Sequence, residues 1–150
     1  MTLIQVSESA HIYASAETIY RLLSDYRTHH PKILPKEFTS LTVHEGGQGA
    51  GTVFTAEMNV MGNKSTYRMR VTELEPGREL METDLDTGLF TTFTIFPLGK
   101  ESQLKITTTF TRKPGFSGWL EGLMMPMFMR RIYRDELQRI DQYAQKLEKE

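Results

Sequence analysis

Hydrophobic positions divide the chain into regions with two different periods. Over residues 38–111 apolar and polar residues alternate, and turn residues split this region into six segments. A period of two is typical of strands with one buried face. Residues 3–13 alternate more loosely and predict a first strand, whereas residues 118–150 follow the period of one long helix. The pattern therefore predicts seven strands followed by a C-terminal helix.

The predicted C-terminal helix has two unlike halves. Residues 119–129 are apolar on nearly every side, which is typical of a segment that is enclosed by protein or touches an apolar molecule. This half holds four of the nine methionines, so it predicts either a wall that adapts to a ligand or a gap-filled core. From Ile132 onward the apolar residues form one stripe, as on an amphipathic surface helix. Pro126 is expected to bend or break the helix, because its ring removes a backbone hydrogen bond.

Three short segments follow from local signals. Ser15 is a typical N-cap for a short helix over residues 16–24. Residues 25–36 contain two prolines and predict a loop or one bent helical turn. The glycine-rich residues 46–51 precede a strand-like segment, whereas a phosphate-binding loop needs a helix directly after it. This segment therefore predicts a flexible hairpin loop.

Turn residues also predict the register of two hairpins. Gly62-Asn63 is typical of a two-residue turn that pairs Met61 with Lys64, which places an exposed Glu57–Arg68 ion pair on the polar face. Around residues 99–102, the simplest register of the next hairpin sets the following pairs opposite each other: Ile95 with Ile106, and Phe93 with Thr108.

The inner face is less clear in two strands. In the short strand over residues 79–85, Met81 and Leu85 are predicted to face inward. In the first strand, Glu8 shares its parity with the apolar residues Val6 and Ala10. It predicts either a bulge or a strand end that turns Glu8 to solvent, or a carboxylate that points into the interior. Since the alternation gives the sheet one dry side, that side must be covered, and only the C-terminal helix is long and apolar enough to cover it.

Composition narrows the classes of function. The 150 residues are expected to form one domain, residues 1–150. A net charge of −1 makes nucleic acid an unexpected partner, and the absence of cysteine excludes disulfides and thiol chemistry. The four histidines have no metal-ligand spacing, so neither a metal nor another cofactor is predicted. No signal peptide or membrane-spanning segment is recognised, which predicts a soluble, cytoplasmic protein.

Several stretches together resemble the START-like superfamily, also called SRPBCC, helix-grip or birch-pollen-allergen-like, and within it the polyketide cyclase/dehydrase and lipid-transport branch. The resemblance rests on residues 12–26, in which Ser15-Ala16 stands where the family has Ala-Pro, on Gly49-Ala50-Gly51-Thr52, and on residues 74–80 around Glu75-Pro76-Gly77. It implies an α+β, helix-grip fold: a curved seven-stranded antiparallel sheet around a long C-terminal helix, with two short helices after the first strand. It also implies an apolar cavity that serves lipids, sterols, quinones, plant hormones or polyketides in different members.

Three hypotheses of function follow. The first is a carrier or sensor that binds a small hydrophobic or aromatic molecule, such as a lipid, quinone or polyketide, between the sheet and the C-terminal helix. The predicted walls of this cavity are Met58, Tyr67, Met69, Phe93, Trp119, Leu123, Met124, Met127 and Phe128. The polar groups expected to face inward are Glu8, Ser65, Tyr67, Thr91, Thr108 and Glu121.

The second hypothesis is an enzyme of the cyclase/dehydrase type, in which Glu8, Tyr67 or Glu121 acts as an acid or base in a dry cavity. The third uses residues 124–129 as an apolar surface patch for a membrane or a partner protein, with basic neighbours at Arg130, Arg131 and Arg134. The sequence identifies neither the ligand nor an oligomeric state.

Overall fold

A computed structural model describes residues 2–112 and 115–150, without the side chains of residues 116–121. In this part of the chain, seven strands form one antiparallel sheet in the order β1-β7-β6-β5-β4-β3-β2. The strands are β1 (Leu3–Ile12), β2 (Phe38–Glu45), β3 (Val53–Val60), β4 (Asn63–Glu75), β5 (Glu79–Asp84), β6 (Phe90–Leu98) and β7 (Glu101–Thr111). The helices are α1 (Ala16–Ser24), the 3-10 helix η1 (His30–Ile33) and α2 (Gly115–Glu148).

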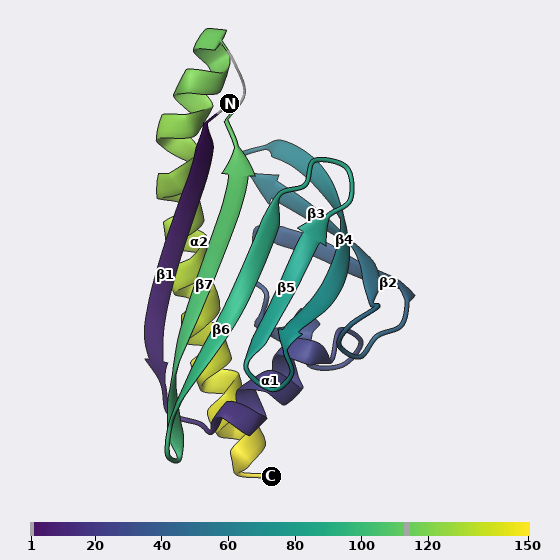
Figure 1. The fold of residues 1–150 in the computed structure, drawn as a ribbon, viewed down its shortest axis with the longest axis vertical. Helices are drawn as coiled ribbons and strands as arrows, with labels where there is room; N and C mark the ends of the chain where they lie inside the picture. The colour runs from purple at the N-terminus through teal and green to yellow at the C-terminus, as the bar shows by residue number, and fades with distance from the viewer. Residues whose placement is uncertain (1, 113–114) are drawn as a thin grey trace.

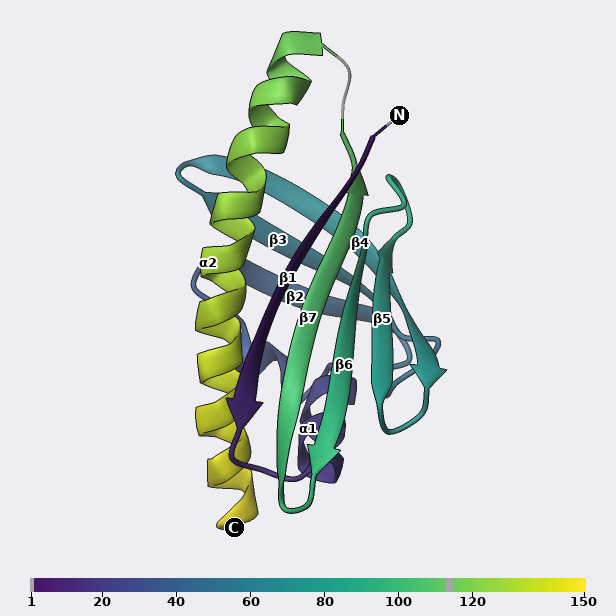
Figure 2. The ribbon, with the colours of Figure 1, turned by 60° about the vertical axis from the view of Figure 1, so that its left-hand side comes forward.

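The sheet curves around α2, as the predicted helix-grip fold requires (Figure 1). Figure 2 shows that β2, β3 and β4 run across the direction of β1 and β7. The helix packs along β1 and also contacts α1 and η1, which lie between the lower end of the sheet and the helix. The hydrophobic core lies between these elements and includes Ile12, Leu22, Phe93, Ile106 and Ile140.

The long helix is continuous through Pro126. Its N-terminal half leans relative to its C-terminal half, so the proline is accommodated by a bend and not by a break (Figure 2). In the C-terminal half the predicted apolar stripe is buried, with Ile132, Leu137, Ile140 and Ala144 facing the core. The predicted amphipathic half is therefore confirmed.

Side-chain hydrogen bonds fasten the end of α2 to the start of α1. The Ser15 hydroxyl caps α1 by accepting from the backbone N–H of Thr18, at 3.2 Å. The Glu148 carboxylate accepts from the Ser15 backbone N–H at 3.0 Å and from the Thr18 hydroxyl at 2.7 Å. The predicted N-cap is confirmed, and these bonds hold the pKa of Glu148 below its usual value.

The predicted register of the β3–β4 hairpin is wrong by two residues. Val60 pairs with Asn63, so the two-residue turn is Met61-Gly62 and not Gly62-Asn63. Both turn residues have positive φ, 54° and 86°, as a type I′ turn requires. A shift of two residues leaves every side chain on its predicted face, and so the alternation of the sequence does not reveal it.

The shift changes which charged residues meet on the outer face. Glu57 lies opposite Thr66 and not opposite Arg68, so the predicted Glu57–Arg68 ion pair is wrong. The Arg68 guanidinium instead pairs with the carboxylate of Asp86, at 3.1 Å.

The β6–β7 hairpin shows the same kind of error. Phe93 lies opposite Ile106 and Ile95 lies opposite Leu104, because Leu98 pairs with Glu101 and the turn is tighter than predicted. The predicted pairs Ile95–Ile106 and Phe93–Thr108 are therefore wrong, although their inner and outer faces are right.

In β5 the predicted inner face is wrong. Leu80, Glu82 and Asp84 are the buried residues, whereas Met81 is half-buried on the opposite face and Leu85 is exposed beyond the end of the strand. The prediction followed the larger apolar residues, but pairing with β4 and β6 fixes the opposite phase. Two carboxyl groups consequently face the interior.

The glycine-rich segment is a hairpin loop between β2 and β3, as predicted, but it is not free of its surroundings. Its backbone bonds to the residues at the end of α1: the Gly47 carbonyl accepts from the Tyr26 N–H and the Gly49 N–H donates to the Ser24 carbonyl, both at 2.9 Å. A Cβ atom at Gly47 would lie 2.5 Å from the Arg27 side chain, so the close approach requires glycine there.

The turn at Met61 yields a prediction about stability. Met61 has a left-handed backbone conformation and is 80% exposed, so its side chain gains little from packing. We expect Met61→Asn to raise the free energy of unfolding by about 1 kcal/mol, because asparagine adopts this conformation at lower cost. We expect Met61→Val to lower it, because β-branched residues tolerate positive φ poorly. Urea denaturation measures both free energies. Equal stabilities of the three proteins, or the reverse of the expected order, would contradict the turn geometry.

Candidate ligand-binding site

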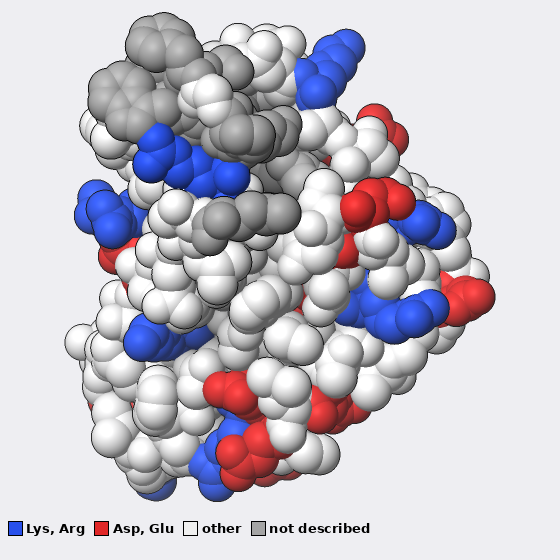
Figure 3. All heavy atoms as spheres, turned by 45° about the horizontal axis from the view of Figure 1, so that its top comes forward, with Lys and Arg blue, Asp and Glu red and all other residues white. Residues whose placement is uncertain are grey.

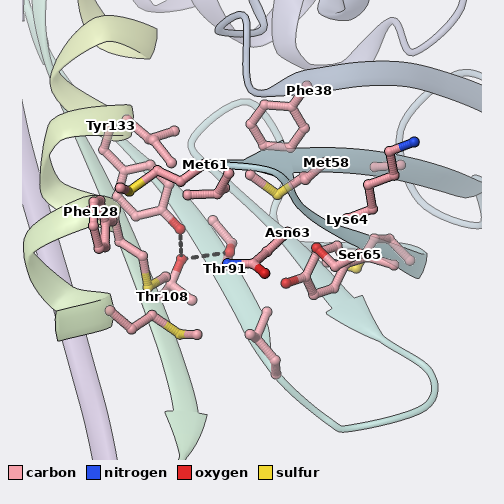
Figure 4. Close-up of a pocket in the computed structure, with 18 of the residues that line it drawn as sticks. Phe38, Met58, Met61, Asn63, Lys64, Ser65, Thr91, Thr108, Phe128 and Tyr133 are labelled. Atoms are coloured by element: carbon pink, nitrogen blue, oxygen red, sulfur yellow. Dashed lines mark hydrogen bonds between the residues drawn. The ribbon is translucent and has the colours of Figure 1, made fainter. Parts of the chain in front are cut away.

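A cavity of about 760 Å³ lies between the inner face of the sheet and α2. Its walls come from β2, from the β3–β4 hairpin, from β6 and β7 with the residue before β6, and from α2 (Figure 4). Most of the lining side chains are apolar. The lining residues are Phe38, Ala56, Met58, Val60, Met61, Asn63, Lys64, Ser65, Tyr67, Met69, Leu89, Thr91, Thr108, Met124, Met125, Phe128, Met129, Ile132 and Tyr133.

The fold explains why this space stays open. The helix is attached along β1, at one edge of the sheet, whereas β2, β3 and β4 lie at the other edge and curve away from it (Figure 2). The inner side chains of β3 and β4, such as Met58 and Tyr67, face the helix across the gap. At the mouth, Met61 and Met124 are exposed although they line the cavity.

A row of hydroxyl groups forms one polar part of the wall. Thr91 and Thr108 lie opposite each other on β6 and β7, and their hydroxyl oxygens are 2.7 Å apart. The Tyr133 hydroxyl, from α2, makes a short hydrogen bond with the Thr108 hydroxyl (Figure 4). Burial raises the pKa of Tyr133 well above its usual value, so this hydroxyl stays neutral. The hydroxyl row, Tyr133–Thr108–Thr91, can therefore donate and accept hydrogen bonds without carrying charge.

Behind this row lies a group of buried ionisable residues. Glu82, on β5, lies directly opposite Thr91 of β6 on the inner face of the sheet. Its carboxylate accepts from the Tyr26 hydroxyl at 2.6 Å and lies 3.7 Å from Nε2 of His30. The His30 Nδ1–H donates to the Leu23 carbonyl at 2.7 Å, which fixes the ring with Nε2 toward Glu82. Burial raises the pKa of Glu82, and the nearby His30 and Tyr26 oppose this shift.

Glu136 completes this group from α2. It is only 3% exposed. Burial raises the pKa of Glu136 to about 8, and the charges of Glu82 and Asp135 add to the shift. At neutral pH the carboxyl group is therefore mostly protonated, which avoids an unpaired charge in the core.

The fold and the cavity described above agree with the comparison of this chain with known proteins. Residues 4–145 match the family described as polyketide cyclase / dehydrase and lipid transport. The chain belongs to this family. The predicted membership of the START-like superfamily is thereby confirmed. No curated protein sequence matches the chain.

Solved structures with the same fold include three informative cases. The KanY protein is 28% identical, with a TM-score of 0.84 over 97% of this chain and 99% of that one. The Zhui aromatase/cyclase from Streptomyces sp. R1128 is 17% identical, with a TM-score of 0.81 over 97% and 95% of the two chains. Norcoclaurine synthase from Thalictrum flavum, in complex with dopamine and hydroxybenzaldehyde, is 18% identical, with a TM-score of 0.73 over 97% and 88%.

The predicted wall residues of this family member fall into three groups. Five of them line the cavity: Met58, Tyr67, Met69, Met124 and Phe128. Phe93 instead packs in the core beside His30, and Leu123 and Met127 are exposed on α2 outside the lining. The Trp119 side chain lies outside the described residues.

Of the residues predicted as acids or bases, Glu8 and Tyr67 are not brought together. Glu8 faces α2, but β1 pairs with β7 without a bulge and the carboxylate of Glu8 binds the Arg134 guanidinium at 3.0 Å, outside the cavity lining. Of the alternatives predicted for Glu8, a bulge or strand end is therefore wrong, and the carboxylate points toward α2 without lining the cavity. Tyr67 lines the cavity, and the Glu121 side chain lies outside the described residues.

Sequence reasoning missed Tyr133 and the buried acids as members of the site. Glu136 does carry a usable signal, because it lies three residues after Tyr133 and four before Ile140, on the apolar stripe of the helix. Glu82 carried no such signal, because the inner face predicted for β5 was wrong.

In the described residues no group of three potential metal ligands comes together, and no helix there is long and apolar enough to cross a bilayer.

The burial of Glu136 predicts a pH-dependent stability. Between about pH 5 and 8 the folded protein keeps a proton on Glu136 that the unfolded chain releases, so the free energy of unfolding falls as the pH rises. Glu136→Gln keeps the shape but removes the titration. We expect its stability relative to the unsubstituted protein to increase by at least about 1 kcal/mol from pH 5 to pH 8.

Urea denaturation at both pH values measures this difference. Glu57→Gln is the matched control, because Glu57 is exposed on the outer face of β3 and its replacement should give the same difference at both pH values. A Glu136→Gln protein with an equally constant difference would show that Glu136 is ionised in the fold.

Proposed function

We propose that this protein binds a small hydrophobic molecule in the cavity between the sheet and α2, and carries or senses it. One observation carries the proposal: the cavity of about 760 Å³ has mainly apolar walls and contains a row of three hydrogen-bonded hydroxyl groups. This volume and composition are typical of sites for small organic molecules. Tight packing of a core would leave no such space, because protein interiors are filled to the density of organic crystals.

The mouth of the cavity supports access by an apolar molecule. Met61, on the hairpin turn, and Met124, on α2, line the cavity and are largely exposed. Methionine side chains are flexible and adapt to differently shaped apolar partners. On the face shown in Figure 3, the described basic and acidic side chains are interspersed with uncharged surface, so charge of one sign does not dominate there.

The similar structures support a ligand with aromatic character. The fold holds two small aromatic molecules in norcoclaurine synthase, and an aromatase/cyclase shares it. The family description names both enzymes and lipid carriers. We favour binding over cyclase or dehydrase chemistry, because the Glu8 carboxylate is paired with Arg134 and does not line the cavity.

A titration tests this proposal directly. Fatty acids, sterols, quinones and flavonoids are added to protein with ¹³C-labelled methionine methyl groups, and chemical shifts are recorded. We expect a ligand to shift the signals of Met58, Met69, Met125 and Met129, which line the cavity, and to leave Met81 on the outer face unchanged. A panel that shifts none of the cavity methyl groups would count against the proposal.

Filling the cavity is a second test. Ala56 lies on the inner face of β3 and lines the cavity, so Ala56→Phe places a ring in the space that a ligand needs. We expect affinity for any ligand found above to fall at least about tenfold, because steric overlap removes apolar contacts. Thr55→Phe is the control, since Thr55 points to the opposite face and its replacement should leave affinity unchanged. Equal affinities of the two variants would place the ligand elsewhere.

A further inference from the structure

Three hydroxyl groups of the cavity wall and one carboxyl group behind them lie in one line. Glu82, Thr91 and Thr108 are direct cross-strand neighbours on β5, β6 and β7. Tyr133 joins this line from α2 and bonds to Thr108. Thr91, Thr108 and Tyr133 line the cavity, whereas Glu82 lies behind them in the core. The cavity therefore meets three hydroxyl groups first and carboxyl groups only beyond them.

Counting protons shows what this row offers to a ligand. Three hydroxyls carry three protons, and the two hydrogen bonds that link them use two. One proton and several lone pairs therefore remain in the row, and this proton lies at one end when each hydroxyl donates to the next. At the Tyr133 end, this capacity faces the cavity (Figure 4). A ligand oxygen placed there completes the row, and an apolar ligand leaves it incomplete at a cost.

The charges around the row disfavour an anion at this place. Glu82 lies behind it, directly opposite Thr91, and when ionised it repels a ligand carboxylate. Lys64 is the only lysine or arginine among the described lining residues. Its ammonium group points away from Tyr133 and the two threonines (Figure 4). An uncharged oxygen is therefore the group that fits.

We propose that the cavity selects an uncharged apolar molecule that carries a ketone or phenol oxygen, and that this oxygen binds at the Tyr133 hydroxyl. The apolar remainder of the ligand lies toward Met58, Phe128 and the mouth at Met61. This inference rests on the proposed binding function, but it adds a chemical class and an orientation that binding alone does not require.

The test compares three probes of nearly equal shape: naphthalene, 1-tetralone, which carries a ketone, and 1-naphthol, which carries a phenol. Dissociation constants are measured for the unsubstituted protein and for Tyr133→Phe. For each oxygenated probe, its affinity relative to naphthalene is compared between the two proteins, so that the different hydrophobicity of the probes cancels. We expect Tyr133→Phe to reduce this relative affinity about two- to tenfold for at least one oxygenated probe, the range of one net hydrogen bond.

The two oxygenated probes show whether the Tyr133 hydroxyl donates the hydrogen bond to the ligand or accepts it. A loss for 1-tetralone supports the proposal with Tyr133 as donor, because a ketone only accepts. A loss for 1-naphthol without one for 1-tetralone supports it with Tyr133 as acceptor. Unchanged naphthalene affinity in Tyr133→Phe shows that the cavity is intact. Naphthalene binding without any loss for either oxygenated probe overturns this inference and leaves the proposed function standing. Failure of all three probes, together with the ligand panel above, contradicts the proposed function itself.

Tyr67→Phe is the matched control, because Tyr67 is the other tyrosine in the described lining and lies on β4, outside the hydroxyl row. We expect a smaller loss of relative affinity in Tyr67→Phe than in Tyr133→Phe, and a loss in Tyr67→Phe without one in Tyr133→Phe overturns the assignment. 1-Naphthoate tests the preference for an uncharged oxygen. We expect it to leave the methyl signals of Thr91 and Thr108 unshifted, and shifts as large as those from 1-naphthol would contradict the preference.

Discussion

The attachment of α2 along β1 is the constraint on which the rest of the structure depends. Contacts along the whole of β1 and just beyond it fix the helix: Arg134 binds Glu8 at 3.0 Å, Asp141 accepts from the Tyr13 N–H at 2.8 Å, and Glu148 binds Ser15. Since β1 is an edge strand, the helix is held to one side of a strongly curved sheet. The opposite strands therefore enclose a space that the helix does not fill.

The two halves of α2 use this geometry differently. The C-terminal half carries branched and small residues, such as Ile140 and Ala144, that pack closely against β1, α1 and the core. The N-terminal half presents Met124, Met125 and Phe128 to the open space between helix and sheet. One helix thus stabilises the fold at one end and forms a cavity wall at the other. The boundary between these two parts of α2 lies near Ile132 and Tyr133, which belong to both the core and the cavity lining.

The sequence predicted the elements and most inner faces, because alternation with a period of two depends only on which face is buried. It could not predict the registers at Met61 and Leu98, since a shift of two residues preserves every face and only the turn conformation separates the alternatives. In β5 the predicted inner face was wrong, because Glu82 and Asp84 face the interior while Met81 lies on the outer face. The alternation did predict that Thr91 and Thr108 face inward. Apolar pattern alone gives no reason to place carboxyl groups in a core, so the buried acids behind the cavity were the least predictable part.

These buried acids and the hydroxyl row are also the strongest reason to regard the interior as a site. Replacing buried charged or polar groups by well-packed apolar residues of similar volume is often neutral or stabilising, so folding alone does not require Glu82, His30 and Glu136 in the core. Their burial has a cost, because each must be neutralised or hydrogen-bonded. The cost is understandable where a hydroxyl row needs a defined polarity behind it: Glu82 lies directly opposite Thr91, and Thr91 leads through Thr108 to the Tyr133 hydroxyl at the cavity surface.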